Sequence, residues 1–208
     1  MPRKNIIDLA GKPLIAWTID ASLNSKYITK TVVSSDDAEI LAIARRYGAD
    51  ALMRPDALAT DTSSSQEVVE HAINSLSEPY DYVILLQPTS PLRDSMAIDD
   101  AFELFFQSDA SALISVREID SKILKAFKEN ELGYIEGISN NEYPFTRRQD
   151  LPKTYMSNGA IYIVKVDEFM KNSTLFTNKT ISYLMNDVKS LDIDTVDDLK
   201  KARERITE

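Results

Sequence analysis

Two aspartates separated by one residue, in Leu191-Asp192-Ile193-Asp194, are the first candidates for chemistry in this chain. On a strand, residues two apart point to the same side, so this spacing predicts that the two carboxylates lie side by side. Like charges that close repel each other and need a cation or a shared proton. Oxygen ligands of this kind suit Mg²⁺, which proteins typically hold with one or two carboxylates plus substrate phosphates. The pattern favours a magnesium site over its alternative, an exposed strand end that leads into a capped helix.

Three further polar groups are candidates for binding an anion or a nucleotide. Arg3-Lys4-Asn5 offers a lysine ammonium, a point charge suited to phosphate, although a solvated basic terminus has the same composition. Arg147-Arg148 with Asn158-Gly159 could form an anion pocket with a close backbone approach at the glycine. Arg54 with the loop 61–65 could read a nucleobase. Surface arginines and serine loops are common, so each signal is weak alone.

A rigid polar loop follows the unbroken apolar run Tyr82–Leu86. Such a run is typical of a strand buried on both faces of a parallel sheet. Pro88 has no backbone donor and ends the strand, and Pro91 stiffens the loop that runs on to Arg93. In open α/β sheets, ligands bind beyond the carboxyl ends of the strands. The loop is therefore either a binding site or a well-capped turn between a strand and a helix.

Composition excludes several classes of function. The 208 residues carry a net charge of −9, which argues against a nucleic-acid surface and against binding to an anionic membrane. The chain has no cysteine, which removes disulfides and thiolate chemistry, and its one histidine, His71, lies in a helix-surface pattern. It lacks the Gly-rich motifs of P-loop and dinucleotide-binding proteins. With no long apolar run and no signal-peptide pattern, a cytoplasmic protein is expected.

Strands and helices alternate along the chain, which predicts an α/β fold with a mostly parallel sheet. The pattern breaks between residues 118 and 157, where two short runs predict a hairpin, and a long excursion inside a compact domain is usually functional or an interface. We therefore expect one domain, 1–208, that contains this excursion. Expected helices are 14–23, 39–47, 66–76, 95–106 and 196–205; expected strands are 31–34, 51–54, 82–86, 112–116, 159–164 and 190–194.

The polar motifs also form an ordered set over nearly the whole chain. In chain order they are Pro2-Arg-Lys-Asn5, Gly11-Lys-Pro-Leu14, Val33-Ser-Ser-Asp36, Arg54-Pro55, Leu58-Ala-Thr-Asp-Thr62, Leu86-Gln-Pro-Thr-Ser-Pro-Leu-Arg93, Asn158-Gly-Ala-Ile-Tyr162 and Asp192-Ile-Asp194. With these motifs the chain resembles the acylneuraminate cytidylyltransferases, the CMP-sialic acid synthetases. The Gln87–Arg93 and Asn158–Tyr162 strings are the specific ones, and their order makes a chance likeness improbable.

The resemblance implies a Rossmann-like three-layer nucleotidyltransferase fold and Mg²⁺-dependent transfer of CMP from CTP to a sialic acid-type nonulosonate, an acidic nine-carbon sugar, with release of pyrophosphate. Attack of a sugar hydroxyl on the α-phosphorus needs alignment and charge neutralisation more than a covalent nucleophile, so the lack of cysteine is no obstacle. The general base stays open between a metal-bound water and a carboxylate.

Residue roles follow from the same resemblance. It implies that Lys4 neutralises the α-phosphate and that Asp192 and Asp194 hold Mg²⁺. The residues implied to contact cytidine are Asn5, Arg54 and Ser65. Those implied to line the sugar pocket are Gln87, Arg148, Asn158 and Tyr162, with Lys125 as a contact to the sugar carboxylate. The family also implies a homodimer in which the excursion, about residues 122–157, completes the partner's sugar site.

The chain departs from the family pattern in two places. The family begins with an apolar strand and a loop of the type Ala-Arg-x-Gly-Ser-Lys-Gly that grips the triphosphate, and neither precedes Met1. We expect Met1 to be an internal methionine of a longer reading frame; the alternative is an N-terminally truncated, inactive form. Met156 stands where some relatives carry an arginine, so legionaminic and pseudaminic acids are candidate substrates beside N-acetylneuraminic acid.

Overall fold

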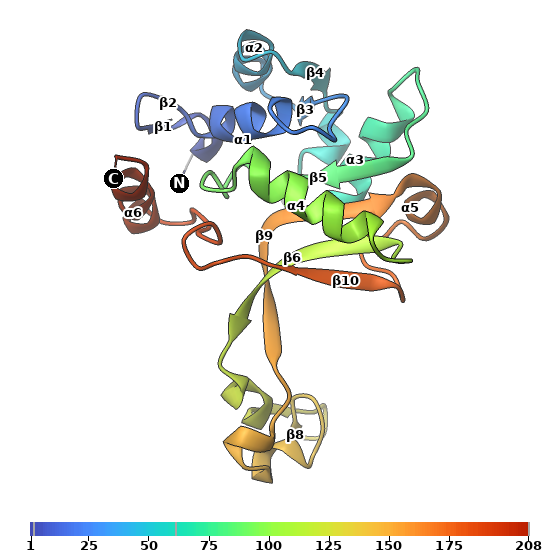
Figure 1. Ribbon diagram of the computed structural model, residues 1–208, viewed down its shortest axis with the longest axis vertical. Helices are drawn as coiled ribbons and strands as arrows, with labels where there is room; N and C mark the ends of the chain where they lie inside the picture. Colours follow the sequence, from blue (N-terminus) through green and yellow to red (C-terminus); the bar gives the residue numbers. More distant parts are fainter. Residues whose placement is uncertain (2, 61, 208) are drawn as a thin grey trace. The chain divides into compact units, whose positions relative to one another are not determined.

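The computed structural model describes residues 1, 3–60 and 62–207 (Figure 1). The chain forms two compact units, one made of Met1–Val116 with Asn158–Glu208 and the other of Arg117–Ser157. Helices and strands alternate through the first unit, which confirms the predicted α/β class. No helix of the described residues is long and apolar enough to cross a membrane.

The first unit is built on a four-stranded sheet with the strand order β10-β6-β9-β5. β10 runs parallel to β6, whereas β9 runs antiparallel to β5 with Tyr162 opposite Leu85. Residues 160, 161, 163 and 164 of β9 are all fully buried, so both faces of this strand are covered. The four strands are β5 (Tyr82–Leu85), β6 (Ala112–Ile119), β9 (Thr154–Lys165) and β10 (Thr180–Leu184).

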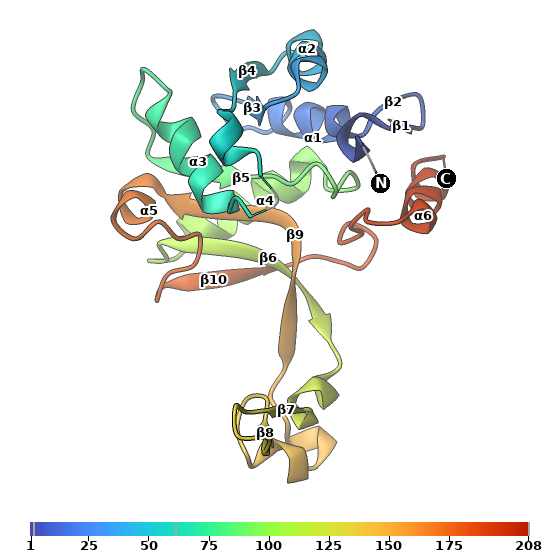
Figure 2. The same cartoon turned by 180° about the vertical axis from the view of Figure 1, so that it is seen from behind.

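Helices cover both faces of this sheet, so the first unit has three layers. α4 packs Ile98, Phe102 and Phe105 against one face, together with strand residues such as Ile161 (Figure 1). α3 lies on the other face, where Val69 packs in a cluster that also includes residues of α5 (Figure 2). The helices are α1 (Leu14–Leu23), α2 (Ala38–Arg46), α3 (Ser65–Asn74), α4 (Ser95–Phe106), α5 (Val166–Asn172) and α6 (Val196–Thr207).

Short polar side chains set where several helices begin. Asp37 caps α2 by accepting from the backbone N–H groups of residues 39 and 40, and Asp94 caps α4. Ser64 caps α3 in a capping box with Glu67. These helices connect strands of the first unit. Two of these strands, β3 (Val32–Ser35) and β4 (Asp50–Met53), form a separate parallel pair. A small hairpin, β1 (Asp8–Leu9) with β2 (Lys12–Pro13), precedes α1.

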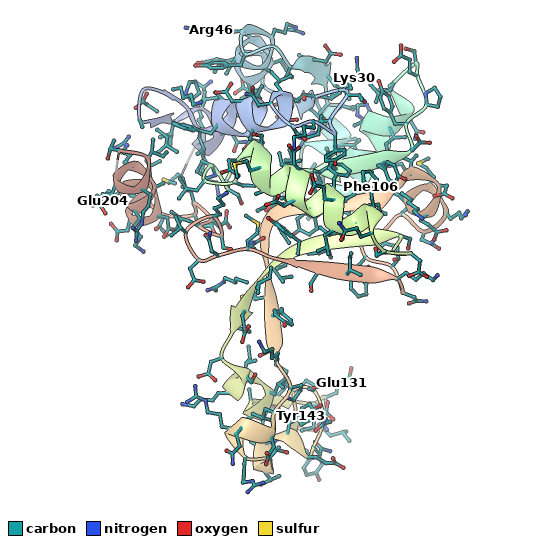
Figure 3. All side chains as sticks on the ribbon, in the orientation of Figure 1. Lys30, Arg46, Phe106, Glu131, Tyr143 and Glu204 are labelled. Carbon is teal, nitrogen blue, oxygen red and sulfur yellow. The ribbon has the colours of Figure 1, made fainter. Side chains whose placement is uncertain are left out.

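A hairpin forms in the second unit, as β7 (Phe127–Glu129) paired antiparallel with β8 (Ile135–Gly137). Its second strand matches the expected run 134–138, but the expected first run, 124–127, lies largely in a 3-10 helix, Ser121–Lys125, and in the turn after it. The structure describes the whole of this unit, and Gly137 is its only buried residue. Large apolar side chains are exposed instead, with Leu132 80% and Phe145 83% exposed. Figure 3 draws the side chains of this unit around the labelled Glu131 and Tyr143. Such a unit has almost no hydrophobic core of its own.

The predicted strand 190–194 is wrong. Ile193 is buried, as the alternation indicates, but its backbone N–H bonds to Thr89 O of the loop after β5 (2.8 Å) and no strand forms there. The apolar alternation therefore reflects one buried side chain in an extended segment, and not a strand that is hydrogen-bonded in a sheet. The sheet also contains β10, residues 180–184, which pairs with β6 and which the periodicity does not predict.

Candidate active site

The loop after β5 is anchored by a buried arginine. Arg93 is 1% exposed, and its guanidinium donates to Thr18 Oγ1 of α1 (2.9 Å) and to the backbone oxygen of Gln87 (3.5 Å). Burial lowers the pKa of Arg93 to about 10, so the group stays charged at neutral pH. Its Nε and Nη1 atoms and Ser90 Oγ are buried without a hydrogen-bond partner among the described residues. The loop is thus anchored by the buried, positively charged guanidinium of Arg93.

The segment that carries the two aspartates lies against this loop. Ile193 joins it through the bond to Thr89 O and packs with Leu9 and Leu14. Because Ile193 points into the core, its two neighbours are available to the site. Asp194 is exposed and accepts from Lys4 Nζ at 2.9 Å. Asp192 Oδ1 is buried and, within the part of the chain that the structure describes, has no hydrogen-bond partner.

Gln87 and the Asn158-Gly159 motif also meet. Gly159 has φ +75, and a Cβ built there would lie 2.3 Å from Gln87 Oε1, so only glycine leaves room for this amide. Asn158 is 6% exposed and its side chain accepts from Ser115 Oγ (2.6 Å) and donates to Ser190 Oγ (2.9 Å). The motif therefore sits between the loop after β5 and the segment that leads to Asp192.

The predicted nucleotide contacts lie on other parts of the first unit. Arg54 follows β4 and donates to the oxygen atoms of Ser34, at 3.2 Å to Oγ and 2.6 Å to the backbone oxygen. This places Arg54 at the carboxyl end of β3. Ser65 is the first residue of α3, and Asn5 lies in the short 3-10 helix after Arg3. No hydrogen bond between described residues joins these three side chains to Asp194, and Asp61 and Pro2 of the predicted motifs lie outside the described residues.

The remaining predicted sugar contacts divide between the two units. Tyr162 belongs to β9 and packs in the cluster on the α3 face of the sheet. Lys125 and Arg148 belong to the second unit, where Lys125 Nζ donates to Pro144 O (3.4 Å) and Arg148 pairs with Asp120 (3.2 Å). Their roles toward a sugar stay predictions.

A cavity of about 680 Å³ lies away from all of these residues. It is at the amino-terminal ends of β3 and β4, and its lining includes Lys30 (labelled in Figure 3), Asp50 and Tyr80. Lys30 pairs with Asp50 across it, and this contact raises the pKa of Lys30. Ligands of open α/β sheets bind at the opposite, carboxyl ends of the strands, where the candidate residues gather.

The carboxylates fit a magnesium ion that substrate phosphates complete. Among residues 1, 3–60 and 62–207, no group of three or more histidine, cysteine, aspartate or glutamate side chains could hold a metal by itself. Mg²⁺ commonly takes only one or two carboxylates and keeps water and phosphate oxygens as its other ligands. Asp192, whose buried Oδ1 has no hydrogen-bond partner among the described residues, and the exposed Asp194 are the two carboxylates that could serve as such ligands.

Sequence reasoning missed the residues that support this site. Ser115 and Ser190 hold Asn158, and Lys189 pairs with Asp94 at the start of α4 (2.7 Å). Single serines and lysines carry no motif, and these partners are far apart in sequence. The polar residue within the otherwise apolar run Ala112–Val116 is the one signal that could have pointed to Ser115.

The first unit has an α/β fold that solved nucleotidyltransferase structures share. Comparison with solved structures agrees: the chain is similar in fold to CMP:2-keto-3-deoxy-manno-octonic acid synthetase complexed with CTP, with a TM-score of 0.73, 16% identity and coverage of 100% of this chain and 92% of that one. The cytidylyltransferase family model matches residues 1–204, and the chain belongs to this family.

The names of similar proteins specify three different sugars. Pseudaminic acid cytidylyltransferase of Campylobacter jejuni is 36% identical over 98% of this chain and 89% of the relative. N-acylneuraminate cytidylyltransferase of Escherichia coli is 36% identical over 92% of this chain and 45% of the relative. CMP-N,N'-diacetyllegionaminic acid synthase of Legionella pneumophila is 35% identical over 94% and 85%. These relatives confirm the resemblance drawn from the motifs.

Proposed function

We propose that this cytidylyltransferase transfers CMP from CTP to a sialic acid-type nonulosonate and releases pyrophosphate, with Mg²⁺ as cofactor. The observation that carries the proposal is the ion pair of Lys4 with Asp194 (2.9 Å), in a segment whose Ile193 N–H bonds to Thr89 O of the loop after β5. Phosphoryl-type transfer is catalysed chiefly by positioning and by neutralising charge, and an ammonium close to a carboxylate that could bind a metal ion is suited to both.

In this proposal the chain's own residues bind and orient the two substrates. Lys4 Nζ, which donates to Asp194 in the protein without substrate, would neutralise the α-phosphate of bound CTP. Asp192 and Asp194 would hold Mg²⁺, which when bound neutralises part of the triphosphate charge. Residues proposed to contact cytidine are Asn5, Arg54 and Ser65; those proposed to line the sugar pocket are Gln87, Lys125, Arg148 and Tyr162.

The three sugar classes are not separated by similarity, since the named relatives are 35–36% identical to the chain. The proposal therefore stops at acidic nine-carbon sugars. The test is pyrophosphate release from CTP, with and without Mg²⁺, in the presence of N-acetylneuraminic, pseudaminic or legionaminic acid. We expect release that needs both Mg²⁺ and one of the sugars. Absence of release with all three would overturn the proposed substrate class.

We also propose that the protein is a homodimer formed through the second unit. The unit Arg117–Ser157 buries only Gly137, has no cysteine, and exposes Leu132 and Phe145 almost fully. A segment of this size without a core, disulfide or metal needs another surface to stabilise it. Burial of its apolar side chains against a second copy supplies that surface.

A further inference from the structure

The segment from Met185 to Asp194 is held mainly by side chains. Its backbone joins the sheet at one end, where Met185 N donates to Val116 O (2.9 Å), and the loop after β5 at the other, through Ile193. Between these points the backbone bonds of Ser190 and Leu191 run only to residues 186 and 188 of the same turn. The contacts that hold this turn in place therefore also set the position of the Asp192 backbone.

The side-chain amide of Asn158 holds this turn in place, and all of its hydrogen-bond donors and acceptors have partners. Its Oδ1 accepts from Ser115 Oγ (2.6 Å) and from the backbone N–H of Ala160 (3.2 Å). Its Nδ2 donates to Ser190 Oγ (2.9 Å) and to Met185 Sδ (3.4 Å). A carboxamide has two acceptor and two donor positions, so none is left for a ligand.

The orientation of this amide follows from its neighbours. A backbone N–H can only donate, so the atom that faces Ala160 must be the oxygen. Ser115 Oγ accepts from Ile161 N (2.8 Å), which leaves its proton for Asn158. The nitrogen then necessarily faces Ser190. Asn158 thus connects β6 and β9 to the turn that precedes Asp192.

We propose that Asn158 is a positioning residue that clamps Ser190 and thereby places Asp192, in contrast to the sugar contact that the family resemblance predicts. Asp192 lies between two fixed points, the side chain of Ser190 and the backbone N–H of Ile193. This rests on the proposed function, in which Asp192 holds Mg²⁺. The clamp itself is a property of the protein without substrate.

Two variants break the same hydrogen bond from opposite sides. Ser190→Ala removes the acceptor, and Asn158→Asp replaces the donor with an oxygen. Ser182→Ala, at an exposed position on β10, is the matched control. For both clamp variants we expect faster hydrogen exchange in peptides covering residues 186–194, with unchanged exchange in the control. Unchanged exchange in Ser190→Ala would overturn the clamp, and this readout does not depend on activity or on the folding of Asn158→Asp.

The link to Asp192 is tested by metal affinity. We expect Mn²⁺ binding in the presence of CTP, followed by electron paramagnetic resonance, to weaken about tenfold in Ser190→Ala, as for loss of other groups that orient a metal ligand. In turnover, the Mg²⁺ requirement rises by the same factor while the KM for the sugar changes less than about twofold. Faster hydrogen exchange with unchanged Mn²⁺ binding would overturn the link between Ser190 and Asp192. A raised KM for the sugar in Asn158→Asp but not in Ser190→Ala would show that Asn158 contacts the sugar directly and would overturn the proposal. If the wild type transfers no cytidylyl group, the proposed function fails while the exchange experiment still decides the clamp.

Discussion

At the scale of single residues, Lys4 and Asp194 form an ion pair in the protein without substrate, and Asp192 keeps a buried oxygen without a hydrogen-bond partner among the described residues. Charges arranged in advance of the reaction lower its barrier because the protein does not have to reorganise around the substrate. The Lys4–Asp194 pair contributes little to the stability of the fold, since an exposed ion pair is worth at most about 1 kcal/mol. Activity and stability should therefore respond differently to their removal.

The first prediction concerns these three charged groups. Lys4→Met, Asp192→Asn and Asp194→Asn are each expected to lower kcat/KM for CTP by about a hundredfold or more, the usual effect of removing a group that stabilises transition-state charge. The measurement is pyrophosphate release at saturating sugar. Asp197→Asn, an exposed aspartate that pairs with Lys200 on α6, is the matched control and should keep wild-type kinetics. Equal losses in the control would show that general charge, not this site, governs the rate.

The second prediction concerns Gly159. Gly159→Ala forces a Cβ toward Gln87 Oε1 and a side chain into a left-handed conformation, so we expect a loss of about 1 kcal/mol in the free energy of unfolding and a raised KM for the sugar. Gly11→Ala is the control: its φ is also positive, +90, but nothing lies within 4 Å of the added Cβ. Chemical denaturation should show a similar loss for both variants. A raised sugar KM in Gly11→Ala as well would contradict the role given to Gln87.

At the scale of elements, the start of α4 is tied to the turn before the aspartates. Asp94 caps α4 through the backbone N–H of Ala97 and also accepts from Lys189 Nζ at 2.7 Å. Partial burial opposes ionisation, but these hydrogen bonds outweigh it and hold the pKa of Asp94 below its ordinary value. One carboxylate thus serves both a helix and the site segment.

The third prediction is a pH dependence of this contact. Because the pKa of Asp94 is lowered on folding, its contribution to stability is present above its unfolded pKa and is lost as the pH falls through the folded pKa. Lys189→Met should raise the pKa of Asp94 and lower stability at neutral pH by about 0.5 kcal/mol, since the pair is partly exposed. Wild type and variant should converge in acid. Urea denaturation over this pH range measures the difference, and a constant difference at all pH values would contradict the assignment.

The elements show how far sequence reasoning reaches. Helix α4 was predicted at its observed bounds, and the starts of α2 and α3 follow from Asp37 and Ser64, because capping is a local interaction. The candidate site residues are also accessible from sequence, since their motifs are contiguous strings, and their roles stay predictions. The segment 190–194 was not, because alternation cannot distinguish a strand from extended chain with one buried side chain. The clamp on Asn158 joins Ser115 and Ser190, which are 43 and 32 residues away, and no local signal records such pairs.

At the scale of the whole molecule, the two units differ in how they are stabilised. The first has helices packed on both faces of its sheet, and the second has exposed apolar side chains and one buried residue. The cytidylyltransferase family model spans both units. In the proposed homodimer, the stability of the second unit should depend on protein concentration.

The fourth prediction tests the proposed association of two copies through the second unit. Phe145→Asp and Leu132→Asp place a charge on the exposed apolar surface of the second unit and are expected to convert a dimer into a monomer. Light scattering on a sizing column should give twice the chain mass for the wild type and one chain mass for the variants. Glu131→Gln, in the same unit, is the control and should stay dimeric. A monomeric wild type would contradict the proposed assembly.

The strands β6 and β9 are neighbours in the sheet, and the second unit consists of the end of β6, the start of β9 and all the residues between these strands in sequence. The chain therefore leaves the sheet along one strand and returns along the adjacent one, in the manner of a domain insertion. Loop-closure entropy grows only slowly with length, so the inserted segment can lengthen, shorten or be exchanged without changing the register of the sheet or the residues around Asp192. Because Lys125 and Arg148, two of the proposed sugar contacts, belong to this unit, a change in the unit can alter sugar binding while the residues around Asp192 stay the same.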